Sequence, residues 1–265
     1  MKTKEMVSEA VDRAIRAHTR NLPKPCEDFL YSDAKKKIYI VLDGITRVHK
    51  EYDETPGQSA ACEVNEIFAE AVVEFISANL NDPDAELLLR QAVKYGNDKI
   101  RENRKKKSLD EWGFYPGTLG IIALLRDSRM HYICAGDCLG MIIRGNTKIC
   151  FGEQLPLAAL EVMKISKKDR YDIYCNHPEN ALSYTIFNGD VCVPDTCEYA
   201  CIDLCAGDVV VLASDGIKNY LKYEFAAVIK NTSAGRLIDL STRYDEPPFG
   251  TYGDDKSLLK FVFAG

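Results

Sequence analysis

The sequence predicts an α+β fold with mainly antiparallel strand pairing. Apolar runs of strand length occur in two groups along the chain, and a pair of long helical patterns precedes the larger group. Strands and helices do not alternate strictly, as they would around a parallel sheet. These two observations favour sheets built from neighbouring antiparallel strands and covered by helices.

The first 107 residues predict three helices and one strand. Residues 5–18 carry apolar side chains at helical spacing. The apolar run at 38–42 has the length of a strand. Two amphipathic patterns then predict helices over 58–80 and 84–107. The basic residues that close the second pattern, 101–107, are typical of a solvated helix C-terminus, where cations are stabilised.

From residue 118 onward the apolar pattern becomes that of strands separated by short turns. Residues 152–195 are less regular, with one expected helix over 155–163. Helices are expected again at 216–230 and 234–243. The predicted strands are 118–125, 131–135, 139–144, 147–151, 198–204, 209–213 and 257–263.

Composition narrows the function classes. The 265 residues suit one large domain or two small ones. With 34 Lys and Arg against 40 Asp and Glu, the net charge of −6 disfavours nucleic acid and anionic membranes as partners. The polar N-terminus lacks a signal-peptide core, and no run approaches the ~20 apolar residues of a membrane span. We therefore expect a cytoplasmic protein, with a monomer as its default state.

The 10 cysteines mostly lie within apolar runs, as at Cys134 and Cys150, and this placement predicts buried, reduced thiols. Cys197, Cys201 and Cys205 recur at every fourth position. Because no CxxC pair or histidine cluster accompanies them, zinc and iron–sulfur sites are disfavoured.

Acidic residues stand at several predicted strand ends: Asp43, Asp137, Asp215 and the pair Asp254 and Asp255. A single Asp-Gly after a strand is typical of a turn. Several such carboxylates at one edge of a core would repel each other and would lose hydration. Hard divalent cations, which prefer oxygen ligands, would explain them together. The residues alone leave both interpretations open, and no P-loop, GxGxxG or HExxH motif competes.

Six short motifs follow one another in a recognisable order. They are Cys26-Glu27-Asp28, Val41-Leu42-Asp43-Gly44, Gly117-Thr118, Ala135-Gly136-Asp137-Cys138, Ala213-Ser214-Asp215-Gly216 and Asp254-Asp255-Lys256-Ser257. This order resembles the metal-dependent serine/threonine protein phosphatases (the PPM, or type 2C, family), in particular the compact bacterial catalytic domains. The resemblance implies a four-layer α-β-β-α sandwich of two antiparallel sheets. It also implies a single domain over residues 1–265, with a variable flap at 152–195.

The resemblance further implies two divalent cations, Mg or Mn, and a third ion held more loosely. Asp43 would bridge two ions, the Gly44 carbonyl would bind one of them, and Asp215 and Asp254 would coordinate the other. Asp137 would help to hold the third ion. Two more acidic residues are implied to hold metal-bound waters: Glu27 and Asp28.

The implied reaction is hydrolysis of phosphoserine and phosphothreonine on proteins. Two cations held by these carboxylates would supply the positive charge that admits a phosphate dianion and would lower the pKa of a bound water to near neutrality. The phosphate-binding arginine of the family is absent, and Lys24 is its best replacement, ahead of Arg20 and Arg47. The histidine proposed as a general acid in some members is also missing, so that water or His49 must protonate the leaving group. No cysteine has a catalytic role.

Two alternatives remain. The missing arginine, together with Ile45-Thr46-Arg47 where many members have a Gly-Gly loop, is compatible with a pseudophosphatase that acts as a binding or regulatory module. The residues are equally compatible with a phosphatase for small phosphorylated molecules, because the flap at 152–195 would determine specificity.

Overall fold

The computed structural model describes residues 10–17, 25–45, 59–107, 115–166, 169–245 and 253–265. Two five-stranded sheets form its centre, with every neighbouring pair of strands antiparallel. One has the order β1-β10-β9-β6-β7, from strands β1 (Asp12–Arg16), β6 (Leu139–Arg144), β7 (Thr147–Phe151), β9 (Val209–Ala213) and β10 (Lys256–Val262). The other has the order β2-β3-β4-β5-β8, from β2 (Asp28–Asp33), β3 (Ile38–Ile45), β4 (Gly117–Arg126), β5 (Arg129–Ala135) and β8 (Glu198–Asp203).

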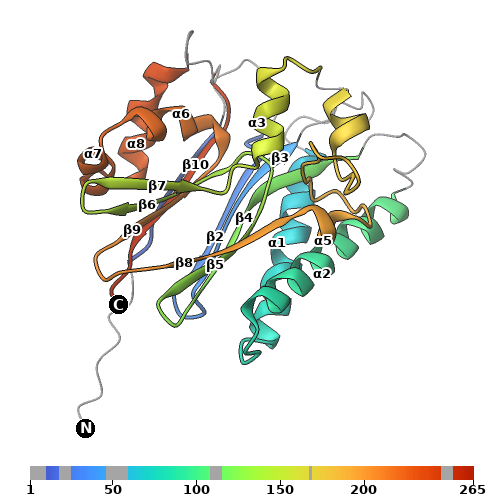
Figure 1. Cartoon of the computed structure of the whole chain (residues 1–265), viewed down its shortest axis with the longest axis horizontal. Coiled ribbons are helices and arrows are strands. Elements are labelled where there is room, and N and C mark those ends of the chain that lie inside the picture. Colours follow the sequence, from blue (N-terminus) through green and yellow to red (C-terminus); the bar gives the residue numbers. More distant parts are fainter. Residues whose placement is uncertain (1–9, 18–24, 46–58, 108–114, 167–168, 246–252) are drawn as a thin grey trace.

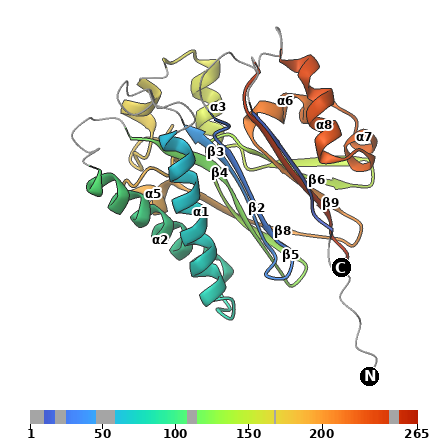
Figure 2. The same ribbon diagram turned by 180° about the vertical axis from the view of Figure 1, so that it is seen from behind.

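Helices cover the outer face of each sheet, so that the molecule has the predicted four layers (Figures 1 and 2). α1 (Ala60–Ala78) and α2 (Ala85–Lys106) pack on the sheet that contains β3. The opposite sheet carries α6 (Asp215–Tyr223), α7 (Ala226–Asn231), α8 (Ala234–Ser241) and the 3₁₀ turn η3 (Thr242–Tyr244).

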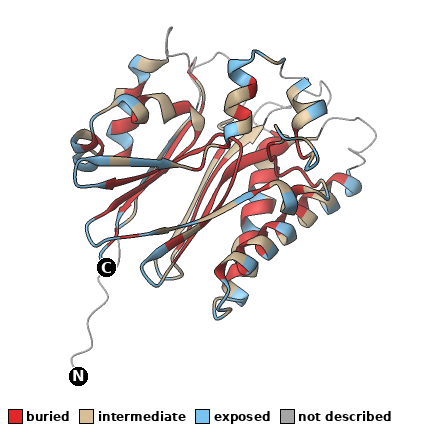
Figure 3. Cartoon of the chain, viewed as in Figure 1, coloured by how far each residue is buried: buried red, intermediate tan, exposed pale blue. Residues whose placement is uncertain are grey.

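The strands are apolar on both faces because both faces are covered. Successive side chains of a strand point to opposite faces. On β3, Ile38 and Ile40 therefore pack against α1 and α2, whereas Tyr39 and Val41 pack between the sheets. Figure 3 shows these strands as a continuous buried centre. The sheet–sheet layer includes the stacked rings of Tyr39 and Phe261, whose centroids lie 4.3 Å apart.

The described residues of 152–166 and 169–195 form an irregular segment at one end of the sandwich, with α3 (Leu155–Val162), the π-helical turn η2 (Arg170–Tyr174) and α5 (Val193–Thr196). Gln154 ties it to the end of β5, because its Oε1 accepts from the Gly136 N–H at 2.7 Å and its own N–H donates to the Gly136 carbonyl at 2.7 Å. A bridge between Thr118 and Phe187 ties it to β4. The predicted irregular region thus lies against the ends of two central strands.

Three sequence predictions were wrong in detail. Residues 12–16 form β1 instead of part of a helix, and β2 was not predicted. The helix expected over 216–230 is interrupted between α6 and α7, where Phe225 is in an extended conformation. Both missed strands lie at sheet edges. Each is formed by pairing with one neighbouring strand, and its local sequence lacks the continuous apolar run of a central strand.

All 10 cysteines are free, but only some are buried. Cys134, Cys138, Cys175 and Cys197 are buried, as the apolar runs predict. Cys150 is exposed, contrary to prediction, because β7 is an edge strand with one face open to solvent. Within the described ranges, no helix combines the length and apolar character needed to cross a membrane.

Candidate metal centre

Antiparallel pairing brings the acidic motifs to one end of the sandwich. Asp43 lies near the end of β3, Asp137 follows the end of β5 by two residues, and Asp215 follows the end of β9 by two residues. Each of these three aspartates offers a carboxylate oxygen that lies within 4.8 Å of those of the other two. The structure therefore assembles in space three residues that are 94 and 78 positions apart in the chain.

A fourth carboxylate lies beside this group, on the strand next to β3. Asp28, at the start of β2, is directly opposite Asp43 in the strand register. Like charges at such positions destabilise a sheet. One oxygen of Asp28 accepts a hydrogen bond from the Ser214 hydroxyl at 2.6 Å. Its Oδ1 is buried and has no hydrogen-bond partner among the described residues.

The surroundings disfavour the charged form of these carboxyl groups. Burial, together with the negative charges of Asp215 and Asp28, raises the pKa of Asp43 well above its ordinary value. Burial also raises the pKa of Asp28, and the hydrogen bond from Ser214 offsets this only in part. The pKa of Asp215 rises to about 7, through burial and the charge of Asp137. The clustered carboxylates therefore lack sufficient positive charge nearby.

This donor set fits hard divalent cations. Carboxylate oxygens converge without thiol or imidazole ligands among the three grouped residues, as Mg and Mn prefer. A divalent cation bound here would give the orphaned oxygen of Asp28 a partner and would offset the causes that raise the pKa values of Asp28 and Asp43.

Gly44 is required by a close approach of the backbone. A Cβ at this position would lie 2.6 Å from the Glu27 carbonyl oxygen and 2.9 Å from the Ala61 Cβ. The Gly44 N–H instead donates to the Glu27 carbonyl at 3.0 Å. The absence of a side chain thus lets the chain after Asp43 lie directly against the Glu27 backbone.

Glu27 is held from several sides. Its N–H donates to Asp255 Oδ2 at 2.7 Å, and its carbonyl accepts from Asn65 Nδ2 at 2.6 Å. Its carboxylate accepts from the hydroxyl of Ser59, which also caps the N-terminus of α1. The residue is 8% exposed, so these contacts orient its carboxylate at the edge of the site.

A lysine also reaches the cluster. Lys218 Nζ lies 2.9 Å from Asp137 Oδ2 and 3.3 Å from Glu153 Oε1, and its side chain is 14% exposed. Burial alone would lower the pKa of Lys218, but the charges of Asp137 and Asp215 outweigh it and raise the pKa. The ammonium is therefore charged and compensates part of the acidic cluster.

No protein-family model matches the sequence, and no curated protein sequence matches it significantly. The structure of the Mycobacterium tuberculosis serine/threonine phosphatase PstP/Ppp matches with a TM-score of 0.66 at 19% identity, over 97% of this chain and 99% of that one. The PstP catalytic domain in complex with two manganese ions matches with a TM-score of 0.59 at 19% identity, over 96% and 99%. The PPM Ser-Thr phosphatase MsPP from Mycobacterium smegmatis, in complex with cacodylate, matches with a TM-score of 0.60 at 14% identity, over 97% and 98%.

The chain has the fold of the bacterial PPM phosphatases. The match covers nearly the whole of each chain, so the likeness includes both sheets and their helices. The fold that the ordered motifs imply is thereby confirmed.

Besides Glu27, Asp28 and Gly44, which are described above, the predicted site residues of this PPM fold fall into three groups. Asp43, Asp137 and Asp215 come together directly. Asp254 lies just before β10, near enough that its charge raises the pKa of both Asp43 and Asp215. The predicted phosphate-binding Lys24, its alternatives Arg20 and Arg47, and the candidate general acid His49 all lie outside the described residues.

Several residues around the site of the PPM fold were not predicted from sequence. Ser214 belongs to a motif that was recognised, but only its aspartate was assigned a role. Asp255 was noted with Asp254 among the acidic residues at strand ends, but its contact was not predicted: it accepts a hydrogen bond from the Glu27 N–H. Lys218 stands three positions after Asp215 in α6, on the same helix face, and this spacing was the available signal.

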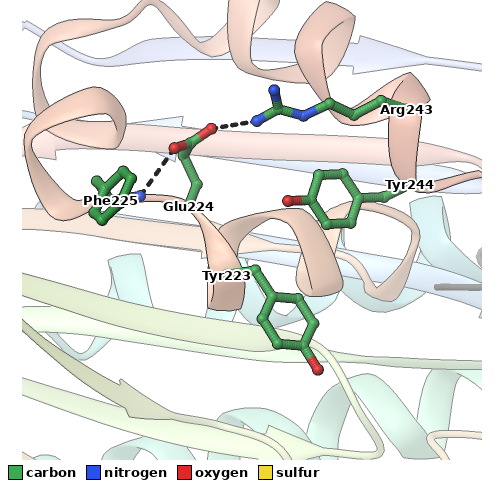
Figure 4. Close-up of a pocket in the computed structure, with 5 residues that line it drawn as sticks. All are labelled: Tyr223, Glu224, Phe225, Arg243 and Tyr244. Atoms are coloured by element: carbon green, nitrogen blue, oxygen red, sulfur yellow. Dashed lines mark hydrogen bonds and ion pairs between the residues drawn. The ribbon is translucent and has the colours of Figure 1, made fainter.

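A surface pocket of about 460 Å³ lies elsewhere on the PPM fold, lined by Tyr223, Glu224, Phe225, Arg243 and Tyr244. Figure 4 shows the Glu224 carboxylate directed at the Arg243 guanidinium, 2.5 Å away, and at the Phe225 N–H, 3.0 Å away. These contacts hold the turn between α6 and α7 against η3. None of the predicted metal ligands lines this pocket.

Proposed function

We propose that the protein is a divalent-metal-dependent phosphatase that hydrolyses phosphoserine and phosphothreonine on proteins. The observation that carries this proposal is the convergence of Asp43, Asp137 and Asp215 at one end of a PPM-type sandwich. Two Mg or Mn ions would be held by Asp43, the Gly44 carbonyl, Asp215 and Asp254. A structural neighbour in complex with two manganese ions supports this number.

The chain's own residues position the site. When bound, two divalent ions supply the positive charge that admits a phosphate dianion, and they lower the pKa of water to near neutrality. Ser214 orients the Asp28 carboxylate, and Ser59 orients that of Glu27. Both carboxylates are thereby placed to accept hydrogen bonds from water at the edge of the site.

A cysteine nucleophile is disfavoured by the same surroundings. Cys138 follows Asp137 directly and is fully buried. Burial, and then the charges of Asp43 and Asp137, raise the pKa of its thiol well above the ordinary value. Because the thiolate is the reactive form, this sulfur stays an inert thiol.

The fold leaves apolar side chains exposed next to the site end, and these support a protein substrate. Leu155 and Val162 are 79% and 82% exposed and lie seven positions apart, on one face of α3. A polypeptide substrate that reaches the site past α3 would bury these two side chains. Faster hydrolysis of phosphopeptides than of small phosphate esters would support this assignment, and the reverse order would favour a small-molecule phosphatase. One domain over residues 1–265, a monomeric state and a cytoplasmic location stay predictions.

The test of the proposal is manganese-dependent hydrolysis of p-nitrophenyl phosphate. Asp43→Asn should lower kcat/KM at least ~100-fold, because metal stabilisation of the transition state is worth several kcal/mol. The matched control is Asp203→Asn at the end of β8, where the side chain is 83% exposed and the rate should not change. Full activity in Asp43→Asn would refute the proposal. Manganese binding without turnover of any phosphate ester would favour the pseudophosphatase.

A further inference from the structure

Lys218 enters the acidic cluster from α6. Asp215 is the first residue of this helix, and Lys218, three positions later, lies on the same face. The ammonium is therefore directed to the end of the sheets where Asp137 follows β5 and Glu153 follows β7. Carboxylates that follow two separate strands thus converge on one nitrogen atom of α6.

The position of Lys218 Nζ bears on how many metal ions the site can hold. It lies 2.9 Å from Asp137 Oδ2, which is a contact distance for a charge-assisted hydrogen bond. Asp137 is the carboxylate that the resemblance assigns to a third, loosely held ion. A divalent cation on that oxygen would have to displace the ammonium or lie beside it against strong repulsion.

Glu153 strengthens the lysine's hold on this position. Its carboxylate contacts Lys218 Nζ at 3.3 Å through one oxygen and Lys222 Nζ at 2.5 Å through the other. Lys218 thus lies between the carboxylates of Asp137 and Glu153, whereas Lys222 contacts only that of Glu153 among the described residues. Both lysines are on one face of the helix, but the contact with Asp137 belongs to Lys218.

We propose that the Lys218 ammonium is a built-in cation that takes the place of the third metal ion, so that the protein binds two divalent ions instead of three. This inference rests on the proposed metal-dependent function and specifies its cofactor content. The fixed charge offsets Asp137 and Asp215 whether or not metal is present. It also links the strand end at Asp137 to the start of the 152–195 segment at Glu153.

The test counts manganese bound per chain when metal-free, full-length protein is titrated, by calorimetry and by the electron paramagnetic resonance signal of free Mn²⁺. The wild type should bind two ions. Lys218→Met, which keeps the length of the side chain but removes the charge, should bind a third, weaker ion. Lys218→Arg should restore the count to two. The matched control Lys222→Met removes a lysine from the same helix face and should also bind two.

Three ions in the wild type, or two in a folded Lys218→Met protein, would overturn the inference. Asp137→Asn supplies a second measurement that does not depend on folding of the lysine variant. It should still bind two ions, because Asp137 is engaged by Lys218, and a lower count would make Asp137 a ligand and refute the inference. Two ions bound without any phosphate hydrolysis would sink the proposed function alone, whereas no ions bound would sink both.

Discussion

The raised pKa values at the acidic cluster predict that the metal-free protein loses stability as the pH rises. Asp215 has a pKa of about 7 in the folded protein, against an ordinary value of 3.8. Between these two values the folded state binds more protons than the unfolded state, so the free energy of unfolding falls with increasing pH. The stabilisation is complete below the lower value and is lost as the pH passes through the upper one. Asp28 and Asp43 act in the same direction.

The size of the effect follows from the shift. Raising the pKa of one carboxyl from 3.8 to about 7 corresponds to about 4 kcal/mol in total. About 2 to 3 kcal/mol of this falls between pH 5 and pH 8. Burial lowers the pKa of His131, and this group works in the opposite direction at the acid end of the range. A comparison of variants that all retain His131 removes its contribution.

The assay is urea unfolding of chelator-treated protein, followed by far-ultraviolet circular dichroism from pH 5 to pH 8. The wild type should lose stability across this range. Asp43→Asn, which removes one carboxylate from the cluster, should show a shallower loss. Saturating manganese should reverse the slope, because protons then compete with the metal for the carboxylates. Metal-free wild-type protein that becomes more stable from pH 5 to pH 8, to the same extent as Asp43→Asn, would refute the reasoning.

Two further predictions concern the frame of the site. Gly216→Ala would place a Cβ 1.9 Å from the Asp255 carbonyl oxygen and should cost about 3 kcal/mol in thermal unfolding, whereas Gly235→Ala, also in a helix but in open space, should be neutral or stabilising by up to about 1 kcal/mol. Equal melting temperatures for the two variants would contradict this packing. Ser214→Ala removes the hydroxyl that donates to Asp28 and should destabilise the metal-free protein by about 1–3 kcal/mol, and an unchanged urea midpoint would show that this bond contributes nothing.

Local sequence was most informative where both faces of a strand are buried. The runs at 38–42 and 209–213 are continuous in apolar residues because one face of each packs on helices and the other on the opposite sheet. β1 and β2 were missed because they are edge strands, whose pairing comes from β10 and β3. In β1, Ile15 is 49% exposed, so an apolar residue at helical spacing does not mark a buried helix face here.

At the helix end 101–107, the local charge pattern failed to predict which basic residue is buried. Its basic residues predict a solvated terminus, yet Arg104 is 7% exposed. Its guanidinium donates to the Asn188 carbonyl at 2.6 Å and pairs with Asp190 at 3.2 Å. The partners are more than 80 positions away, so that local charge pattern cannot separate this buried arginine from its solvated neighbours.

The sequence and the tertiary structure each determined a different part of the acidic site. The sequence by itself determined the order of the acidic motifs, their placement at strand ends and the fold class, because apolar periodicity and short motifs are local properties. The tertiary structure decided which carboxylates meet, since the strand register sets Asp28 opposite Asp43 and antiparallel pairing brings Asp137 and Asp215 to the same end. It also decided that Lys218 joins them, because the direction of a side chain from a helix depends on how that helix packs.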